Sequence, residues 1–326
     1  MTAEINFRYP GRTIVVGPDR ETEKYLRPVF GDTDLVLIQS YMIKVGNDNV
    51  GVFLHELKAE NFETLVIEKR TKNLKEIKFS ERLLAEANPI DVFPKIFGVI
   101  RRAGGVASIF LEYINGRSGS VKSDAECRRL VSLAISSLNR HVFFDKVSVS
   151  MPESLVRVYS QSKSVGLLRV LNSSTSATRR VDDYLAAAIS SPLVFCHNDI
   201  YWPNLEVSSE NRVFFFDFGY ADYNIVGADF HWFVFWLADS LAKYNCPVED
   251  LFSSQRSVQN IFFVQLMGMI KHYCDDRDES VSTVLKNAAL FAFCRASLGF
   301  KVEPRFNDPC HERRLKILVD LLLLEI

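Results

Sequence analysis

The chain has 326 residues, of which 48% are hydrophobic and 24% charged, and its formal net charge is -1 at pH 7. This composition is typical of a soluble globular protein with enough apolar material for one large domain or two. A net charge near zero argues against nucleic acid or an anionic membrane surface as the main partner. The start of the chain lacks the features of a signal peptide, and the longest apolar runs, 230–237 and 261–270, are too short to span a bilayer.

The cysteines indicate a reducing compartment. None of the six forms a C-x-x-C pair, and their spacing is irregular. Such scattered thiols favour a cytoplasmic protein over a disulfide-stapled or zinc-binding one. They are Cys127, Cys196, Cys246, Cys274, Cys294 and Cys310.

The N-terminal part of the chain favours β-structure. Its first 35 residues mix short apolar pieces with Pro, Gly and charge, and we expect a lead-in and a first strand there. Residues 35–38 predict a strand and residues 41–54 predict a β-hairpin. The turn of this hairpin has Gly46, Asn47 and Asn49 between two apolar runs. A turn that contains Gly lets backbone N–H groups approach phosphate oxygens, although an ordinary hairpin tip is the alternative.

A lysine ends the next apolar strand. Residues 62–70 predict a strand whose alternation places Leu65, Ile67 and Lys69 on one face. A lysine at the end of an apolar strand face can reach the α and β phosphates of a nucleotide. The alternative for Lys69 is a solvated charge at an edge.

Residues 73–87 predict a helix with an apolar stripe that includes Ile77 and Leu84. Glu76 and Glu81 of this helix are both available to pair with the lysine. Glu81 is the preferred partner because it lies on the stripe itself, four residues after Ile77. The alternative is that both glutamates are solvated surface charges.

Two further strands, 93–100 and 106–111, flank a turn that contains Gly. They lead into Glu112, Tyr113 and Ile114. An extended crossover at this point would offer backbone N–H and C=O groups to the edge of an adenine ring. The alternative is a plain strand end followed by a turn.

A change in composition marks the predicted boundary between two lobes. The piece 115–120 is rich in Gly and Ser, and from residue 123 onward the spacing of apolar residues is helical. The predicted helices are 124–140, 152–171 and 181–189. We therefore expect a β-rich N-terminal lobe of residues 1–115 and a helical C-terminal lobe of residues 116–326.

The most informative stretch is 193–219. Two short apolar runs, 193–196 and 213–216, predict buried strands. A carboxylate beside a buried strand is costly unless it has a partner or a role. The residues that follow the runs are His197, Asp199 and Asn204 after the first and Asp217, Phe218 and Gly219 after the second.

These residue types match the needs of phosphoryl transfer from a nucleotide. One carboxylate, here Asp199, must accept the proton of the attacking hydroxyl, and an amide and a second carboxylate must hold Mg²⁺ against the phosphates. Asn204 and Asp217 would supply those two ligands, because Mg²⁺ prefers oxygen and takes the remaining ligands from phosphate and water. The alternative is a β-hairpin with buried polar caps.

The segment from His197 to Asn204, together with Asp217, Phe218 and Gly219, resembles the catalytic and metal loops of the aminoglycoside phosphotransferase and choline kinase superfamily. The resemblance implies an α+β, protein-kinase-like bilobal fold, with a small antiparallel β lobe carrying one helix and a large, mainly helical lobe. It implies ATP, or GTP in its place, as phosphate donor and Mg²⁺ as cofactor. The acceptor would be the hydroxyl of choline or ethanolamine, of an amino sugar, or of a cell-surface sugar.

The resemblance also implies roles for residues elsewhere in the chain. Nucleotide contacts are implied for Gly46, Asn47 and Asn49 at the phosphates, for Lys69 held by Glu81, and for Glu112, Tyr113 and Ile114 at the adenine.

Two residues near the catalytic loop are expected to support it. Asp229 fits the position at which the family starts a buried helix that braces the loop, and a carboxylate suits a helix N-terminus. His197 is expected to be structural and not a general base. Trp202 and Trp232 are possible substrate contacts through cation–π attraction, with burial in the core as the alternative.

The sequence therefore predicts a small-molecule kinase with Asp199 as catalytic base. One alternative is a nucleotide-binding pseudokinase scaffold, but such a scaffold need not keep Asp199, Asn204 and Asp217. Another is a protein kinase, which the absence of an Ala-Pro-Glu segment after Asp217 argues against. The sequence does not indicate an oligomeric state.

Overall fold

The computed structural model describes most of the chain. The described residues are 14–17, 20–31, 34–44, 49–60, 62–86, 91–116, 124–141, 175–190, 192–252, 257–302 and 310–324. The chain forms two compact units, one of residues 1–116 with 214–220 and one of residues 117–213 with 221–326. The first unit thus takes in a short stretch that lies far downstream in the sequence.

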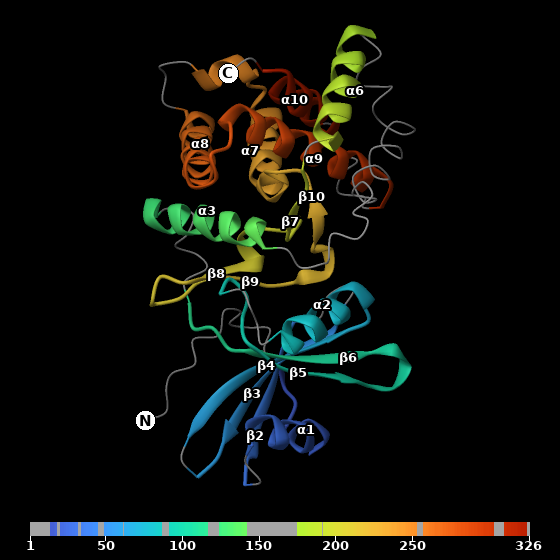
Figure 1. Ribbon diagram of the computed structural model, residues 1–326, viewed down its shortest axis with the longest axis vertical. Coiled ribbons are helices and arrows are strands. Elements are labelled where there is room, and N and C mark those ends of the chain that lie inside the picture. The colour runs from blue at the N-terminus through green and yellow to red at the C-terminus, as the bar shows by residue number, and fades with distance from the viewer. Residues whose placement is uncertain are drawn as a thin grey trace. The chain divides into compact units, whose positions relative to one another are not determined.

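A six-stranded antiparallel sheet, in the order β1-β2-β3-β4-β6-β5, is the framework of the first unit (Figure 1). Its strands are β1 (Ile14–Val15), β2 (Val36–Lys44), β3 (Asn49–Lys58), β4 (Glu63–Thr71), β5 (Ile96–Arg101) and β6 (Ala107–Glu112). The sequence predicts one strand at 35–38 and a separate hairpin at 41–54. In the structure, the first predicted strand and the first arm of the hairpin form one continuous strand, β2. Its register against β3 shifts between Leu37 and Gln39 and again between Met42 and Lys44.

Two helices pack on this sheet, whereas the sequence predicts one. The additional helix, α1 (Arg20–Phe30), lies in the stretch predicted as a lead-in. Its charged composition and Pro28 near its end obscure the helical pattern. Leu26 of α1 is fully buried in one cluster with Leu37 and Val66, so α1 covers the face of the sheet that bears Val66.

The second helix, α2 (Leu74–Ala85), covers the other face. Asn73 caps it by accepting hydrogen bonds from two backbone N–H groups of its first turn. The helix packs on β5, and its Glu76 reaches Lys69 of β4. Val66 and Lys69 point to opposite faces of β4, because side chains alternate along a strand.

A buried polar network surrounds Glu68 of β4, on the face that α1 covers. The Glu68 carboxylate accepts two hydrogen bonds from Arg70, at 2.7 and 3.0 Å, and one from Arg102 at 2.9 Å. His55 Nε2 lies 2.9 Å from the same carboxylate, and the Ser108 hydroxyl donates to it. Burial would raise the pKa of Glu68, but hydrogen bonds from His55, Arg70 and Ser108 hold that pKa well below its usual range.

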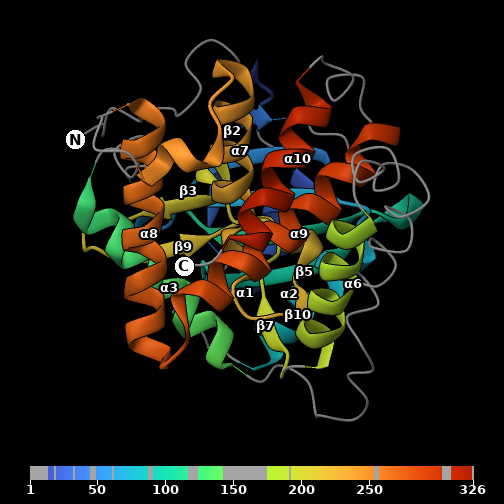
Figure 2. The ribbon, with the colours of Figure 1, turned by 90° about the horizontal axis from the view of Figure 1, so that it is seen from above.

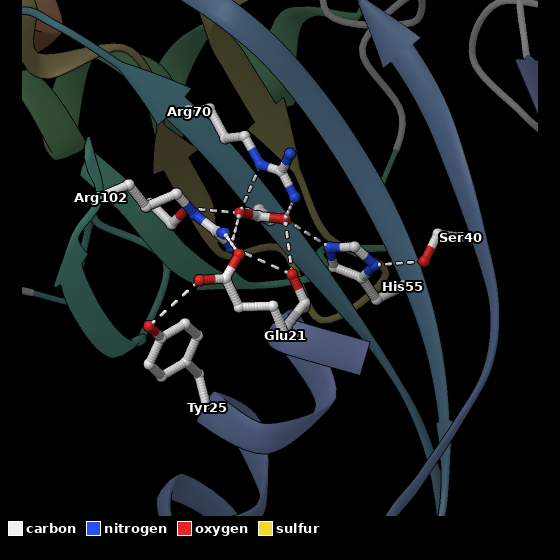
Figure 3. A network of polar contacts seen from close by, with 9 residues as sticks. Glu21, Tyr25, Ser40, His55, Arg70 and Arg102 are labelled. Atoms are coloured by element: carbon white, nitrogen blue, oxygen red, sulfur yellow. Dashed lines mark hydrogen bonds and ion pairs between the residues drawn. The ribbon is translucent and has the colours of Figure 1, made fainter. Parts of the chain in front are cut away.

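The network joins α1 to the sheet. Figure 3 shows Glu21 and Tyr25 extending from α1 toward Arg102, and Glu21 forms an ion pair with Arg102 at 2.9 Å. On the other side, the Ser40 hydroxyl lies 2.9 Å from Nδ1 of His55. The polar groups of this face are therefore paired with one another.

The second unit is mainly helical. Its helices are α3 (Ala125–Arg140), α6 (Thr175–Ser190), α7 (His231–Tyr244), α8 (Val258–Arg277), α9 (Val281–Val302) and α10 (His311–Leu323). Its strands are β7 (Val194–Cys196), β8 (Leu205–Val207) and β10 (Asp222–Asn224). Strand β9 (Val213–Phe215) leads from this unit into the downstream stretch of the first unit. Helix α3 lies beside α8, and α7, α9 and α10 pack together (Figure 2). The helix predicted at 152–171 lies outside the described residues.

Strand β7 pairs antiparallel with β10, with Cys196 opposite Asp222. This pairing fixes the point at which β7 ends and the loop from His197 begins. The predicted α+β class, with a small antiparallel sheet lobe and a mainly helical lobe, is confirmed. Among the described helices, none has the length and apolar character needed to cross a membrane.

Candidate active site

Lys69 is the centre of a buried ion-pair cluster in the first unit. Its Nζ donates to Oε1 of Glu76 and, at 2.9 Å, to Oδ1 of Asp217. Lys69 is 7% exposed and Glu76 is 2% exposed, whereas the Asp217 side chain is one-third exposed. The cluster therefore has a buried end at Glu76 and an accessible end at Asp217.

The charges of this cluster do not balance, because two carboxylates share one ammonium group. Burial would lower the pKa of Lys69, but the charges of Glu76 and Asp217 outweigh burial and raise that pKa above its ordinary value. Burial raises the pKa of Glu76, although the charge of Lys69 opposes it. Lys69 thus stays cationic between a buried carboxylate and a partly exposed one.

The prediction that Glu81 holds Lys69 is wrong, since Glu76 does so. Glu81 instead forms an exposed ion pair with Arg101 at 2.8 Å. The reason is the rotation of α2, because its buried residues include Glu76, Ile77, Ser80 and Leu83. Leu84, which the sequence places on the inward stripe, is 40% exposed, and Leu74 at the start of the helix is 60% exposed.

The loop that carries Asp217 is fixed against α2. Asp217 has a φ of 69°, a left-handed conformation that is uncommon for residues other than glycine. Phe218 is buried and packs edge-on against Phe93, with ring centroids 4.8 Å apart. A Cβ atom on Gly219 would lie 2.6 Å from Nδ2 of Asn73, so the cap of α2 leaves room only for glycine.

The other nucleotide contacts predicted in the first unit are only partly described. Gly46 and Asn47 lie outside the described residues, and Asn49 is the first residue of β3, opposite Thr71. Glu112 ends β6, and its N–H donates to the carbonyl of Lys95 at 2.9 Å. An adenine at this position would therefore find the Glu112 N–H already engaged.

Asp199 is held in a defined orientation in the second unit. Its Oδ1 accepts the indole N–H of Trp232 at 2.8 Å, and its Oδ2 accepts the side-chain amide N–H of Asn204 at 2.9 Å. The Asp199 side chain is 11% exposed, so the carboxylate is constrained but accessible. With one hydrogen bond to each oxygen, the group keeps lone pairs for a further donor.

Arg295 completes this arrangement, and the sequence analysis missed it. Its guanidinium donates to the carbonyl of Asn198 at 2.6 Å and lies 3.6 Å from Oδ1 of Asp199. It extends from α9, almost a hundred residues downstream. The available signal was a lone charge within the apolar run 288–296, because such a charge is costly unless it has a partner.

Trp232, predicted as a possible substrate contact, has contacts within the protein instead. Its N–H binds Asp199, and the guanidinium of Arg295 lies over its ring at 5.6 Å. One face of the indole therefore already has a cation. Trp202 is buried and packs against Phe233, with ring centroids 4.9 Å apart.

Asp229 contacts the backbone of the loop that contains Asp199. It is fully buried and accepts the N–H groups of Asn198, at 2.8 Å, and His197, at 3.4 Å. The side chain of Asn139 also donates to it at 3.1 Å. Burial raises the pKa of Asp229 despite these hydrogen bonds. Such contacts suit a residue that supports the loop, as does the complete burial of His197.

The side chain of Asn204 is oriented by its contact with Asp199. Among the described residues, no group of three or more His, Cys, Asp or Glu side chains could hold a metal. Asn204 turns its amide N–H toward Asp199, which leaves its Oδ1 as a ligand atom. Mg²⁺ suits such sparse ligands, because water and phosphate complete its coordination.

The sequence profile of the choline/ethanolamine kinase family matches residues 139–297. A choline kinase from Cryptosporidium parvum superposes with a TM-score of 0.55 at 15% identity, over 94% of this chain and 95% of that one. An ethanolamine kinase from Plasmodium vivax gives a TM-score of 0.52 at 14% identity, over 88% of this chain and 82% of that one. A thermostable mutant of the aminoglycoside phosphotransferase APH(4)-Ia, solved with ADP and hygromycin B, gives 0.56 at 10% identity, over 92% and 98%.

No curated protein matches the chain. At 10–15% identity, the solved structures establish a shared fold. Together with the family profile, they confirm the resemblance predicted from the loops at Asp199 and Asp217: the chain has the protein-kinase-like fold and is similar to the aminoglycoside phosphotransferase and choline kinase superfamily.

Proposed function

We propose that this protein is an ATP- and Mg²⁺-dependent phosphotransferase that moves the γ-phosphate of ATP to a hydroxyl of a small molecule. The observation that carries the proposal is the setting of Asp199. Its carboxylate is oriented by Trp232 and Asn204 and stays accessible. A carboxylate held in this way can accept the proton of an attacking hydroxyl as the new P–O bond forms.

The cluster at Lys69 supports the nucleotide half of the proposal. Lys69 stays cationic beside an accessible carboxylate, and we assign it to the α and β phosphates, with Glu76 as its buried anchor. Phosphate contacts from Gly46, Asn47 and Asn49, and adenine contacts from Tyr113 and Ile114, complete this assignment. GTP in place of ATP would use the same phosphate contacts.

Asn204 and Asp217 are the residues that would hold Mg²⁺, through one amide oxygen and one carboxylate. When bound, the ion neutralises charge on the transferring phosphate. Arg295 would steady Asp199 from the side of α9, because its guanidinium lies 3.6 Å from Oδ1 of that carboxylate.

The acceptor is a small hydroxyl compound, and choline and ethanolamine are the first to test because their kinase family matches residues 139–297. Amino sugars and cell-surface sugars follow. All six cysteines are free, which fits an enzyme of the reducing cytoplasm.

The test is a nucleotide-consumption screen against these acceptors, followed by two variants. Asp199→Asn keeps the size of the side chain and removes the base, so kcat should fall by about a thousandfold while the thermal shift with Mg-ATP persists. Asp217→Ala should abolish that shift. An Asp199→Asn enzyme that turns over at the parent rate, or an Asp217→Ala protein with an unchanged shift, would overturn the assignment.

A further inference from the structure

A buried chain of hydrogen bonds runs from α8 through α3 to the loop that contains Asp199. The Tyr273 hydroxyl of α8 donates to Oδ1 of Asn139 in α3 at 2.7 Å. Nδ2 of Asn139 donates in turn to the carbonyl of Phe195, at 2.8 Å, and to Oδ2 of Asp229, at 3.1 Å. Tyr273 is fully buried and Asn139 is 4% exposed, so bulk water does not compete for these bonds.

The side-chain amide of Asn139 has one orientation that satisfies its neighbours. The carbonyl of Phe195 can only accept a hydrogen bond, so Nδ2 must face it and Oδ1 must face Tyr273. Because Oδ1 is buried, it needs a donor, and the Tyr273 hydroxyl supplies one. Burial raises the pKa of Tyr273, so the hydroxyl keeps the proton that it donates. The hydroxyl therefore fixes the amide that binds Asp229.

Asp229 connects this amide to the loop. Its Oδ1 accepts the N–H of Asn198 at 2.8 Å, and the guanidinium of Arg295 binds the carbonyl of the same residue at 2.6 Å. Asn198 has a φ of 62°, a left-handed conformation that is uncommon for residues other than glycine. Asp199 is the next residue in the chain, so the direction of its side chain depends on a backbone conformation that these hydrogen bonds hold.

We infer that Tyr273 and Asn139 are positioning residues for Asp199, and that they act through Asp229 and the backbone of Asn198. The inference rests on the proposed phosphotransferase function in what it says of catalysis. The hold on the loop is open to a separate measurement that needs no substrate.

Tyr273→Phe is the first variant, because it removes one oxygen atom and keeps the ring that packs in the core. The kcat should fall by about fivefold, the size expected for one hydrogen bond within the protein. The KM for Mg-ATP should stay at the parent value, since Lys69 and its partners take no part in this chain of hydrogen bonds.

Tyr184→Phe is the matched control. The Tyr184 hydroxyl of α6 likewise donates to Oδ1 of an asparagine, Asn287 of α9, at 2.9 Å, and the amide of Asn287 donates to the carbonyl of Val226. Both variants lose a hydroxyl bonded to an asparagine, so both should lower the melting temperature, but only Tyr273→Phe should lower kcat. A Tyr273→Phe enzyme with the parent kcat, or an equal fall of kcat in both variants, would overturn the inference.

Asn139→Ala tests whether the hydroxyl acts through the amide. Phe195 and Asp229 both lose their donor, so kcat should fall by about thirtyfold, as for two hydrogen bonds lost together. Adding Tyr273→Phe to Asn139→Ala should lower kcat no further, because the two side chains act in series. Losses that multiply would overturn the inference. If Asn139→Ala does not fold, the comparison of Tyr273→Phe with Tyr184→Phe decides alone.

Amide hydrogen exchange separates this inference from the proposed function. It is measured on the peptide that contains His197 and Asn198, whose N–H groups donate to Asp229. Exchange should be about fivefold faster in Tyr273→Phe and unchanged in Tyr184→Phe, because the loop opens more often when its support is weakened. Unchanged exchange in Tyr273→Phe would overturn the inference even in an active enzyme. Faster exchange in a protein that consumes no nucleotide with any acceptor would support the hold on the loop and count against the proposed function.

Discussion

Strand β4 carries two buried charged clusters, one on each face, from adjacent residues. Glu68 lies under α1 and is fully buried, and its carboxylate is surrounded by two arginines, a histidine and two hydroxyl groups. Lys69 lies under α2 and shares its charge between Glu76 and Asp217. Both clusters surround a charged residue of β4, yet their electrostatics differ.

The two clusters differ in the balance of their charges and in their exposure to solvent. In the Glu68 network Arg70 and Arg102 lie beside the buried carboxylate, Arg102 also pairs with Glu21, and the pKa of Glu68 is held low. In the Lys69 cluster the carboxylates exceed the cation, the pKa of Glu76 is raised, and Asp217 is partly exposed. A charged group that the protein encloses completely indicates a structural role, whereas a buried charged cluster with a partly exposed carboxylate is a candidate for ligand binding.

The strongest test of this contrast is Glu68→Gln. The substitution keeps the shape of the side chain but removes the buried carboxylate that Arg70 and Arg102 share, so that Arg102 keeps only its ion pair with the more exposed Glu21 among the ion pairs described above. Breaking a buried ion pair on one side lowers the free energy of unfolding by about 3–5 kcal/mol. Urea denaturation measures this loss.

Nucleotide binding is the control for Glu68→Gln. The thermal shift with Mg-ATP, taken relative to the variant's own melting temperature, should match that of the parent. A stable Glu68→Gln protein with weakened nucleotide binding would place the ligand on the α1 face and reverse the comparison.

The opposite pattern is expected for Lys69→Met. Methionine fills the volume of the lysine stem and removes the charge, so kcat/KM for the nucleotide should fall by at least about a hundredfold, as for loss of one charge-stabilising group. The loss of stability should be smaller than for Glu68→Gln, because the raised pKa of Glu76 lets this carboxyl take up a proton. Steady-state kinetics and urea denaturation of the same preparation separate the two effects, and unchanged kinetics would contradict the assignment.

The sheet and both loops were predictable because their signals are local. Alternation and turn residues give β3 and β4, and short apolar runs followed by Asp199 and Asp217 locate the loops. Helix α1 was missed because Pro28 and its charges obscure its apolar stripe, which becomes clear only once the sheet face under it is known.

The partners of the charged groups were not predictable from the sequence alone. The choice between Glu76 and Glu81 depends on how α2 is rotated over β4, and the Asn73 cap and the packing of α2 on β5 set that rotation. Arg295 comes from a helix almost a hundred residues away from Asp199, so only the tertiary fold brings them together. Patterns along the chain identify residue types and faces, whereas partners depend on rotation and long-range packing.

The contributions of Glu68 and Glu76, on opposite faces of β4, to the free energy of unfolding should also change in opposite directions with pH. The pKa of Glu68 is lowered from 4.5 in the folded state, so its stabilising contribution is present above that pH and is lost as the pH falls toward the folded pKa. The pKa of Glu76 is raised from 4.5, so its ionisation disfavours the folded state as the pH rises above that value.

This contrast is measurable by urea denaturation at a series of pH values. The difference in unfolding free energy between the parent and Glu68→Gln should shrink as the pH falls below 4.5. For Glu76→Gln, the free energy of unfolding of the parent relative to that of the variant should decrease as the pH rises above 4.5. Slopes of the same sign in both variants would show that the clusters are electrostatically alike.

The smallest effect is expected for Glu81→Gln. Glu81 pairs with Arg101 at the surface, where both side chains are more than 40% exposed, and an exposed pair contributes about 0–1 kcal/mol. The free energy of unfolding should therefore change by less than about 1 kcal/mol, and kcat and KM should equal those of the parent. Glu76→Gln is the matched variant on the same helix, and it should impair nucleotide use because Lys69 loses its anchor. A Glu81→Gln enzyme that is impaired as strongly as Glu76→Gln would restore Glu81 as the partner of Lys69 in the working enzyme.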